Sequence, residues 1–268
     1  MSADSTTTTD RLRPLRYLWR VPLLLLHILL GIFCAFVAGT KPNAVMTKGR
    51  EPFAHRMTRW WSRRLLRIFG MRSVRVGQPL PDAVLFVANH TSWIDIVMMD
   101  SQRAVCFVAK SEIAGWPLIG WMAAAGGTIF HRRGNNHSLS AVMQVMVDRL
   151  RAGRSVGVFP EGGSGYNGVL KVFHARIFQA ALDADVPVQP VALRFARQGK
   201  RIIDAGFRVD ESFVQNILRL LGEPPMDAEV HFLATVPATP DARRRMAELS
   251  RERIAAALGD SATGDATV

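Results

Sequence analysis

The sequence has only two cysteines and no metal-binding spacing between them. It contains neither a C-x-x-C nor an H-E-x-x-H motif, so no metal site is indicated. Cys34 lies in an apolar run and Cys106 in a strand-like segment. A disulfide between them is not expected, and a reducing, cytoplasmic setting fits this cysteine content better than an oxidising one.

Acidic residues are scarce relative to basic ones. Asp and Glu number 22 against 34 Lys and Arg, which gives a formal net charge of +12. This excess favours an anionic partner: a nucleic acid, a phospholipid surface or a phosphorylated substrate. No motif that reads RNA or DNA is present, so nucleic acid is not expected as a partner. The 268 residues, 49% of them hydrophobic, suffice for one sizeable globular domain with an appendage.

Charge is absent altogether from Val21–Gly39, a run of 19 residues interrupted in its apolar character only by His27. As a helix this run would be about 28 Å long, close to the thickness of a bilayer's hydrocarbon core. A buried core helix is seldom apolar on every side at this length, so we predict a membrane-inserted helix. A cleaved signal peptide is the alternative, but no A-x-A site follows. Basic residues flank both ends, so a full span and a helix that dips into one leaflet both stay open.

A second helical pattern follows the apolar run, with arginines gathered on one side. Its apolar face comprises Met57, Trp60, Trp61, Leu65, Ile68 and Phe69, and its basic face Arg56, Arg59, Arg63 and Arg67. Tryptophans beside a row of arginines suit the lipid headgroup region, which predicts an amphipathic interfacial helix. The alternative is an ordinary helix that covers the soluble core and keeps its basic face in water.

From residue 73 the pattern becomes that of an α/β protein. Strands are predicted at Val84–Ala88, Val105–Ala109, Ser155–Phe159, Val188–Leu193 and Glu229–Val236, and helices at Ser138–Leu150 and Asp241–Leu258. Strands that alternate with helices indicate a largely parallel sheet flanked by helices on both faces. Pro190 counts against a central position for its strand and indicates an edge or a bulge.

The segment Asn89–Asp95 directly follows the first of these strands. A histidine at the carboxyl end of a strand lies where open α/β sheets bind ligands. If a helix begins near Ser92, Asp95 falls in its first turn and can reach back to His90. A carboxylate on one ring nitrogen leaves the other free as a general base, so the pair can deprotonate an alcohol. The alternative needs no catalysis, because Ser92-x-x-Asp95 is also a capping box.

A glycine-rich turn, Phe159–Gly163, follows another predicted strand. Its backbone N–H groups suit an anion or an oxyanion. Ser164 invites comparison with the G-x-S-x-G motif, but that motif's fifth position is occupied by Tyr166, so a serine hydrolase is not indicated.

Taken together, these motifs resemble four ordered blocks of the lysophosphatidic acid acyltransferase family. His90 and Asp95 match its H-x4-D block; the segment 127–133 (GTIFHRR) resembles G-x-x-F-x-D-R; 159–162 (FPEG) matches the start of FPEGTRS; and 186–192 (VPVQPVA) matches V-P-[VI]-x-P-V-[AS]. The segment 110–121 also resembles the stretch between the family's first two blocks. The likeness covers about residues 80–195.

The resemblance implies direct acyl transfer to a lysolipid, most simply lysophosphatidic acid. In the family's mechanism His90 would act as the base and Asp95 would orient it, with no covalent acyl-enzyme. The placement of the two cysteines agrees, because neither is placed as a nucleophile. Arg133, Glu161 and Gly162 would bind the acceptor, and Lys110 its phosphate. No cofactor is implied; acyl-CoA or acyl carrier protein would be the co-substrate, and a phospholipid surface the other partner.

The sequence departs from the family pattern in three places. Arg132 replaces the aspartate of the second block, Gly163-Ser164 replaces Thr-Arg in the third, and 173–176 (FHAR) replaces F-K-x-G. Arg132, Lys171 and Arg176 are candidates to return positive charge to the pocket. They equally suit a different acceptor, such as another lysophospholipid or a lyso-ornithine lipid, because Lys and Arg are not interchangeable as anion ligands.

These observations predict five regions. They are a disordered N-terminus (1–16), a membrane-associated helical region (17–72), an acyltransferase α/β domain (73–240), a C-terminal helix (241–258) and a disordered tail (259–268). We expect the protein at the bacterial inner membrane, with its catalytic domain facing the cytoplasm. A non-enzymatic, basic membrane-binding protein is the alternative of another class.

Overall fold

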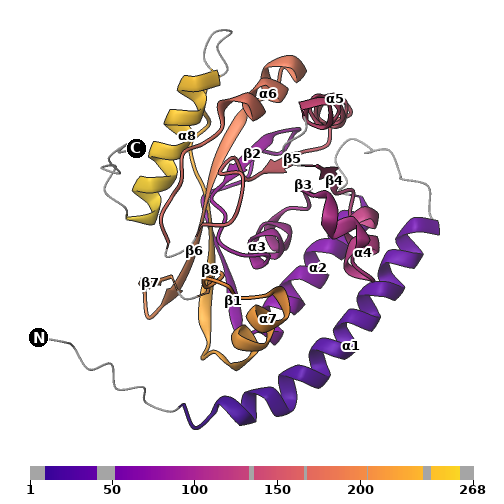
Figure 1. Cartoon of the computed structure of the whole chain (residues 1–268), viewed down its shortest axis with the longest axis vertical. Helices are drawn as coiled ribbons and strands as arrows, with labels where there is room; N and C mark the ends of the chain where they lie inside the picture. Colours follow the sequence, from indigo (N-terminus) through magenta and orange to yellow (C-terminus); the bar gives the residue numbers. More distant parts are fainter. Residues whose placement is uncertain are drawn as a thin grey trace, which may run out of the picture.

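The computed structural model describes residues 10–40, 52–132, 136–165, 168–203, 205–237 and 243–259 (Figure 1). Its helices are α1 (Arg13–Thr40), α2 (Phe53–Ile68), α3 (Ile94–Gln102), the 3-10 helix η1 (Ser111–Gly115), α4 (Ile119–Ala125), α5 (Asn136–Arg151), the 3-10 helix η2 (Ala175–Phe178), α6 (Gln179–Ala184), α7 (Phe213–Gly222) and α8 (Arg243–Leu258). Its strands are β1 (Met71–Val76), β2 (Leu85–Ala88), β3 (Cys106–Lys110), β4 (Ile129–His131), β5 (Val156–Val158), β6 (Val188–Arg197), β7 (Lys200–Ile202) and β8 (Met226–Phe232).

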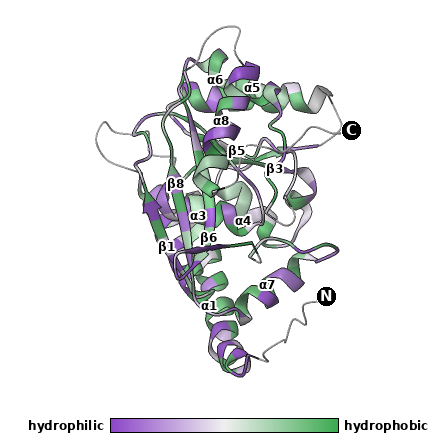
Figure 2. Ribbon diagram, turned by 90° about the vertical axis from the view of Figure 1, so that its left-hand side faces the viewer, coloured by the Kyte–Doolittle hydropathy of each residue, from purple (hydrophilic) through white to green (hydrophobic). Residues whose placement is uncertain are grey.

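The strands form one mixed, mostly parallel sheet in the order β1-β8-β6-β2-β5-β3-β4, with β7 paired to β6. The five strands from β6 to β4 run parallel to one another. β8 is antiparallel to β6 and carries β1 parallel to itself at the edge. Hydrophobic and hydrophilic residues are interspersed along β8, whose alternate residues are buried (Figure 2). The predicted α/β class and largely parallel sheet are confirmed.

One expectation about the sheet is wrong: the strand that contains Pro190 is central, between β2 and β8. Pro190 is opposite Val87 in the ladder with β2, whereas the ladder with β8 begins one residue later, at Val191. The carbonyl of Pro190 accepts from Leu233 on the β8 side, 3.0 Å away. Since the N–H and C=O of a strand residue point to the same side, the missing donor faces Leu233 and costs no bond of the β2–β6 ladder; the Leu233 carbonyl accepts from the Gln189 side chain instead, at 3.1 Å.

Two hydrophobic clusters cover the two faces of the sheet. On β2, Phe86 and Ala88 contribute to the cluster beneath α2, α3 and α7, whereas Leu85 and Val87 contribute to the cluster beneath α5, α6 and α8. A central parallel strand is therefore apolar at every position, because each face is buried in turn. This explains why VLFVA reads as a continuous apolar run.

Helix α1 lies along the outside of the domain (Figure 1) and contacts it through one stripe of residues. Arg20, His27 and Gly31 belong to this stripe, at helical spacing, and are all buried. His27 Nε2 lies 3.0 Å from the carbonyl oxygen of Trp61 on α2, and Trp61 Nε1 donates to the His27 carbonyl at 3.2 Å. A Cβ at Gly31 would lie 2.6 Å from Trp61 Nε1, so only glycine allows the two helices to approach this closely.

The other sides of α1 carry exposed apolar residues, among them Leu25, Leu26, Leu29, Phe33 and Phe36. Within the described chain, α1 alone is long and apolar enough to cross a membrane, over Arg13–Phe36. It begins before the predicted run, because Arg13, Arg16 and Arg20 are held by the protein and not by solvent alone.

Helix α2 places most of its apolar face inside the protein. Leu65 and Leu66 are buried in the core, Trp61 stacks on His27 of α1 with ring centroids 5.0 Å apart, and Arg63 donates to the Ser101 carbonyl at 2.7 Å. Trp60 keeps 43% of its surface exposed. A helix that covers the core thus describes the apolar face of α2.

Candidate active site

The candidate catalytic residues lie at one edge of the sheet. β2, β5, β3 and β4 are consecutive parallel strands, so their carboxyl ends meet at the same edge. The residues at or just after the ends of these four strands include His90, Glu161, Lys110 and Arg132, in that spatial order. The fourth sequence block instead lies at the opposite edge, because Val188 begins β6. It supplies a central strand and no side chain to this edge.

His90 and Asp95 form the pair that the sequence predicts. His90 Nδ1 lies 3.0 Å from Asp95 Oδ2, and the Asp95 side chain is fully buried while 18% of the His90 side chain is exposed. The same carboxylate accepts from the backbone N–H groups of Thr91 and Ser92 at 2.6 and 2.8 Å. A carboxylate only accepts, so Nδ1 carries the proton and Nε2 of the neutral ring is the basic nitrogen.

The structure contains one of the two hydrogen bonds of the capping box formed by Ser92 and Asp95. Asp95 accepts the backbone N–H of Ser92, as a capping box requires, but Ser92 Oγ donates to Asn216 Oδ1 at 3.3 Å instead of capping the helix. Helix α3 begins at Ile94, two residues later than predicted. Asp95 therefore holds both the loop backbone and the imidazole ring.

Two neighbours fix the turn that carries His90. Phe159 stacks on the imidazole with ring centroids 4.1 Å apart and an interplanar angle of 18°. Asn89 exchanges two hydrogen bonds with the backbone of Leu193, at 2.7 and 2.9 Å, so its side chain extends the β2–β6 ladder past the end of β2. Sequence reasoning assigned no role to Asn89; a polar residue between a buried strand and a candidate base was the available signal.

Glu161 is buried and braces the site. Its Oε1 accepts from the backbone N–H of His90 at 2.7 Å, and its Oε2 accepts from that of Lys171 at 2.9 Å. Burial raises the pKa of Glu161 above its usual value, and the two N–H donors oppose that rise. Both oxygens are thus engaged by backbone, an arrangement that suits positioning of the His90 turn better than direct contact with an acceptor. Gly162 has φ +72°, and a Cβ there would lie 3.1 Å from His174 Nε2.

The predicted cations are spread around the site. Lys110 Nζ lies 3.0 Å from Glu112 Oε1, and both side chains are about half exposed. Lys171 Nζ donates to the Ser164 carbonyl at 2.9 Å. Arg132 and Arg176 are exposed. Arg133 lies outside the described residues. Ser164 stands where the resemblance would place an arginine.

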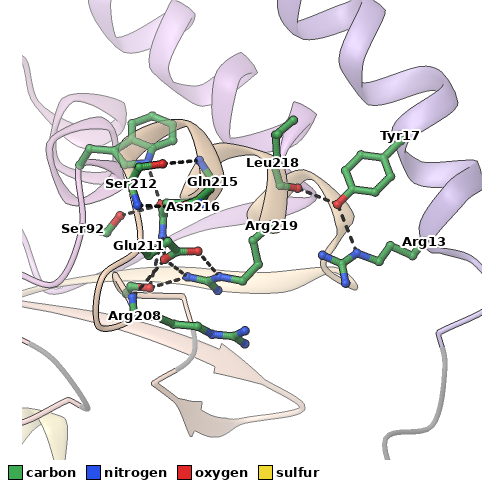
Figure 3. A network of polar contacts seen from close by, with 12 residues as sticks. Arg13, Tyr17, Ser92, Arg208, Glu211, Ser212, Gln215, Asn216, Leu218 and Arg219 are labelled. Atoms are coloured by element: carbon green, nitrogen blue, oxygen red, sulfur yellow. Dashed lines mark hydrogen bonds and ion pairs between the residues drawn. The ribbon is translucent and has the colours of Figure 1, made fainter.

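A polar network contacts the loop 89–95, which carries His90 and Asp95 and is called the catalytic loop below. The network extends to α7 and to α1 (Figure 3). Asn216 is fully buried; its Oδ1 accepts from Trp93 Nε1 at 2.9 Å and its Nδ2 donates to Glu211 at 2.9 Å. The hydrogen bond from Arg219 holds the pKa of Glu211 down at about 2. Also on α7, the Leu218 carbonyl accepts from Tyr17 of α1 at 2.9 Å. Nothing in the sequence indicated this network, because Ser92 and Asn216, which it joins, are 124 residues apart in the chain.

Replacing Asn216 with alanine is expected to lower both stability and turnover. The change leaves the Trp93 and Ser92 donors beside the catalytic loop without their acceptor, at a cost of about 1–3 kcal/mol. Urea unfolding and initial rates measure the two effects. Gln215→Ala is the matched control: it removes half of the capping box with Ser212 on the same helix, touches no residue of the loop, and should cost about 1 kcal/mol with turnover unchanged. Equal losses of turnover in both variants would contradict a positioning role.

Comparison with known proteins identifies the family. Residues 73–194 match the family model named Acyltransferase. Over 91% of this chain and 94% of the relative, the sequence is 34% identical to the lyso-ornithine lipid O-acyltransferase of Pseudomonas aeruginosa. The 1-acyl-sn-glycerol-3-phosphate acyltransferase of Neisseria gonorrhoeae is 31% identical over 70% of this chain and 76% of its own length. The chain belongs to the lysophosphatidic acid acyltransferase family. It is an O-acyltransferase that acts on lysolipids.

A solved structure shares the fold of this acyltransferase. The crystal structure of the 1-acyl-sn-glycerophosphate (LPA) acyltransferase PlsC from Thermotoga maritima aligns with a TM-score of 0.65, over 91% of this chain and 95% of that one, at 17% sequence identity. The resemblance stated from the four blocks is therefore confirmed at the level of the family and of the fold. The two curated relatives carry different acceptor names, so family membership alone does not choose the acceptor.

Proposed function

We propose that this acyltransferase transfers a fatty acyl chain from a thioester to the free hydroxyl of a lyso-ornithine lipid, with His90 as general base. The observation that carries the chemistry is the contact of His90 Nδ1 with the buried Asp95 carboxylate, which makes Nε2 the basic nitrogen. The donor is acyl-CoA or acyl carrier protein, as the resemblance implies.

The proposed reaction needs no covalent enzyme intermediate. His90 Nε2 takes the proton of the acceptor hydroxyl while the hydroxyl oxygen attacks the thioester carbonyl carbon. The tetrahedral intermediate collapses with loss of the thiolate, which receives the proton from the imidazolium. Asp95 keeps the ring in one tautomer and stabilises its positive charge in the intervening steps. Phe159 and the Glu161 brace hold the ring and its turn in place.

Two observations favour this acceptor: the charges at the site and a relative that aligns over nearly the full length of both chains. The headgroup of a lyso-ornithine lipid is an amino acid, so it offers a carboxylate and an ammonium and not a phosphate dianion. Lys110 and Glu112 present the complementary pair of charges at the site's edge. The block-three arginine that the resemblance would bring to a phosphate is replaced by Ser164. The Pseudomonas relative, named for this acceptor, aligns over nearly the full length of both chains.

Lysophosphatidic acid is the second candidate. It is favoured by the exposed cations Arg132 and Arg176 near the site, by the net charge of +12, and by the Neisseria relative's name. An exposed arginine can bind phosphate through two charge-assisted hydrogen bonds.

A comparison of acceptors tests this choice. Purified enzyme is given lyso-ornithine lipid, lysophosphatidic acid and lysophosphatidylglycerol with one acyl donor, and the products are quantified by mass spectrometry. We expect lyso-ornithine lipid to have the highest kcat/KM. Glu112→Gln should raise the KM for lyso-ornithine lipid up to about fivefold, because an exposed charge pair contributes up to about 1 kcal/mol.

The matched control for this test is Glu248→Gln on α8, whose carboxylate is exposed to the same degree and pairs with Arg245 at 3.6 Å. It should change nothing. Preference for lysophosphatidic acid, with no penalty from Glu112→Gln, would reject lyso-ornithine lipid in favour of the second candidate.

We also propose that α1 anchors the enzyme in the inner membrane, with the catalytic domain in the cytoplasm. Support comes from the outward apolar residues of α1 and from the location of thioester donors in the cytoplasm. Burying apolar side chains in a bilayer does not depend on ionic strength, whereas attachment through arginines does.

Most of the protein is therefore expected to stay with membranes after a wash in 1 M salt (about a 3 Å Debye length). A variant with Leu25, Leu26 and Leu29 changed to Gln should be released in large part, because three exposed apolar contacts are lost. These leucines are chosen because Arg16, Tyr17 and Arg20, which bind α7, stay in place. Immunoblots of the wash and the pellet report the result. Full release of the unmodified protein by salt would reject the anchor.

A further inference from the structure

The segment from Ile113 to Thr128 is a second apolar surface that the lysolipid chemistry leaves unexplained. It contains no charged residue, and most of its side chains are exposed. Trp116, Leu118, Ile119 and Trp121 keep between 38% and 51% of their surface accessible. Single exposed apolar residues are ordinary on a soluble protein, but a continuous uncharged stretch with two tryptophans is typical of an interaction surface.

This segment continues the apolar side of α1. Leu29, Phe33 and Phe36 of α1 face Leu118 and Trp121 across a groove of about 510 Å³, which Ile32 also lines. The helices α1 and α4 lie side by side there (Figure 1). Since the proposed anchor places α1 among lipid acyl chains, the same chains reach the groove and the exposed side of α4.

The backbone of the segment holds its apolar side chains outward. Leu118 has φ 63° and ψ −54°, and Ile119 N–H donates to the Pro117 carbonyl at 2.7 Å, which closes a tight three-residue turn. This turn is uncommon for a residue with a side chain. A Cβ at Gly120 would lie 2.4 Å from the Ala114 carbonyl oxygen, so α4 packs directly on η1. The result is a compact projection in which the Leu118 side chain is about half exposed.

Aromatic contacts connect this segment to the catalytic loop. The ring of Trp116 lies 5.1 Å from that of Phe213 on α7, and Phe213 lies 5.5 Å from Trp93, three residues after His90. The apolar surface and the base are therefore on adjoining parts of one packed unit. An amphiphilic acceptor held in the leaflet at α4 would have its headgroup on the His90 side.

We propose that the segment 113–128, which includes the end of η1 and all of α4, inserts into the same bilayer leaflet as α1 and is the surface over which the lysolipid acceptor enters. Lipid acyl chains fill the groove between α1 and α4. Trp116 and Trp121 lie at the level where acyl chains meet headgroups, the depth that tryptophan prefers. The proposal rests on the membrane attachment proposed above and not on the identity of the acceptor.

An environment-sensitive fluorophore at Ile119 tests the insertion without any activity measurement. The label is attached to Ile119→Cys in a chain that carries Cys34→Ser and Cys106→Ala, reconstituted in phosphatidylglycerol–phosphatidylethanolamine vesicles. The matched control is the same label at Val145→Cys on α5, a residue with the same 39% exposure. We expect several-fold brighter, blue-shifted emission at position 119 that acyl-chain nitroxide lipids quench, and no such change at position 145.

Three outcomes would overturn the proposal. Equal emission at both positions would place α4 in water. Emission at position 119 that follows protein concentration and not lipid would assign the surface to a second copy of this chain. Quenching only by headgroup nitroxides would place the segment above the acyl chains.

A measurement of KM with two forms of the acceptor distinguishes membrane insertion of the segment from the choice of acceptor. Ile119→Glu should raise the KM for an acceptor presented in vesicles about tenfold, the factor expected if about 1.4 kcal/mol of surface binding is lost. The same variant should treat a short-chain, monomeric acceptor as the unmodified enzyme does, and Val145→Glu should leave both unchanged. A loss with both acceptors would indicate damage to the site instead.

Discussion

Replacing His90 with alanine is expected to lower turnover by about 10²–10⁴, the contribution of a positioned general base. The loss should appear in kcat at saturating acceptor, since the base acts on the hydroxyl and not on acceptor binding. Folding should survive, because the partner carboxylate of Asp95 keeps the backbone donors of Thr91 and Ser92. Initial rates with acyl-CoA, and thermal unfolding of the same preparation, measure the two quantities.

The chain supplies a matched control for this variant. His231 Nε2 lies 2.9 Å from Glu229 Oε2, and both of these side chains are 16% exposed, close to the 18% of His90. The pair lies on β8, away from the carboxyl ends that carry the site. His231→Ala should keep its activity. A fully active His90→Ala enzyme would end the proposed mechanism, and equal losses in the two variants would show that any buried histidine–carboxylate pair is needed for the fold.

The second large effect is expected from Asp95→Asn. The asparagine side chain can still accept an N–H through its oxygen, but it carries no charge to stabilise the imidazolium and can impose the wrong tautomer on His90. We expect a fall in kcat of about 10²–10⁴. Stability should fall by about 1–3 kcal/mol, because Oδ2 accepts from the ring and from both backbone donors, and the uncharged amide oxygen that replaces it is a weaker acceptor for all three.

Glu229→Gln is the control, since it makes the same chemical change in the His231 pair. Stopped-time product analysis and urea unfolding distinguish the outcomes. Asp95→Asn with normal turnover and reduced stability would assign Asp95 to loop capping alone, the alternative that the Ser92-x-x-Asp95 spacing raises. Reduced turnover with normal KM for both substrates is the result that supports an orienting role.

The acceptor illustrates what can and cannot be inferred from residue types without a structure. The sequence alone favoured lysophosphatidic acid, on the strength of Lys110 and Arg133. In the structure Lys110 pairs with Glu112, a residue to which the sequence assigned no role. A neighbouring acid changes what a lysine can bind, and it becomes visible only when side-chain directions are known.

The sequence by itself determined the fold class, the family and the contact between His90 and Asp95. Local signals suffice for these: apolar runs that end in polar turns mark buried strands, and His90 with Asp95 is a contact between residues five apart. Such interactions are set by the backbone of one loop, so spacing predicts them.

Only the tertiary structure decided which residues brace that pair. Glu161 reaches the His90 backbone across 71 residues, Asn89 reaches Leu193 across 104, and Asn216 reaches the loop from α7. It also decided that Pro190 is central and that α2 turns its apolar face to the core. The physical reason is the same in each case: these contacts depend on which strands and helices become neighbours, and that order follows from burying two faces of one sheet at once, which no local pattern encodes.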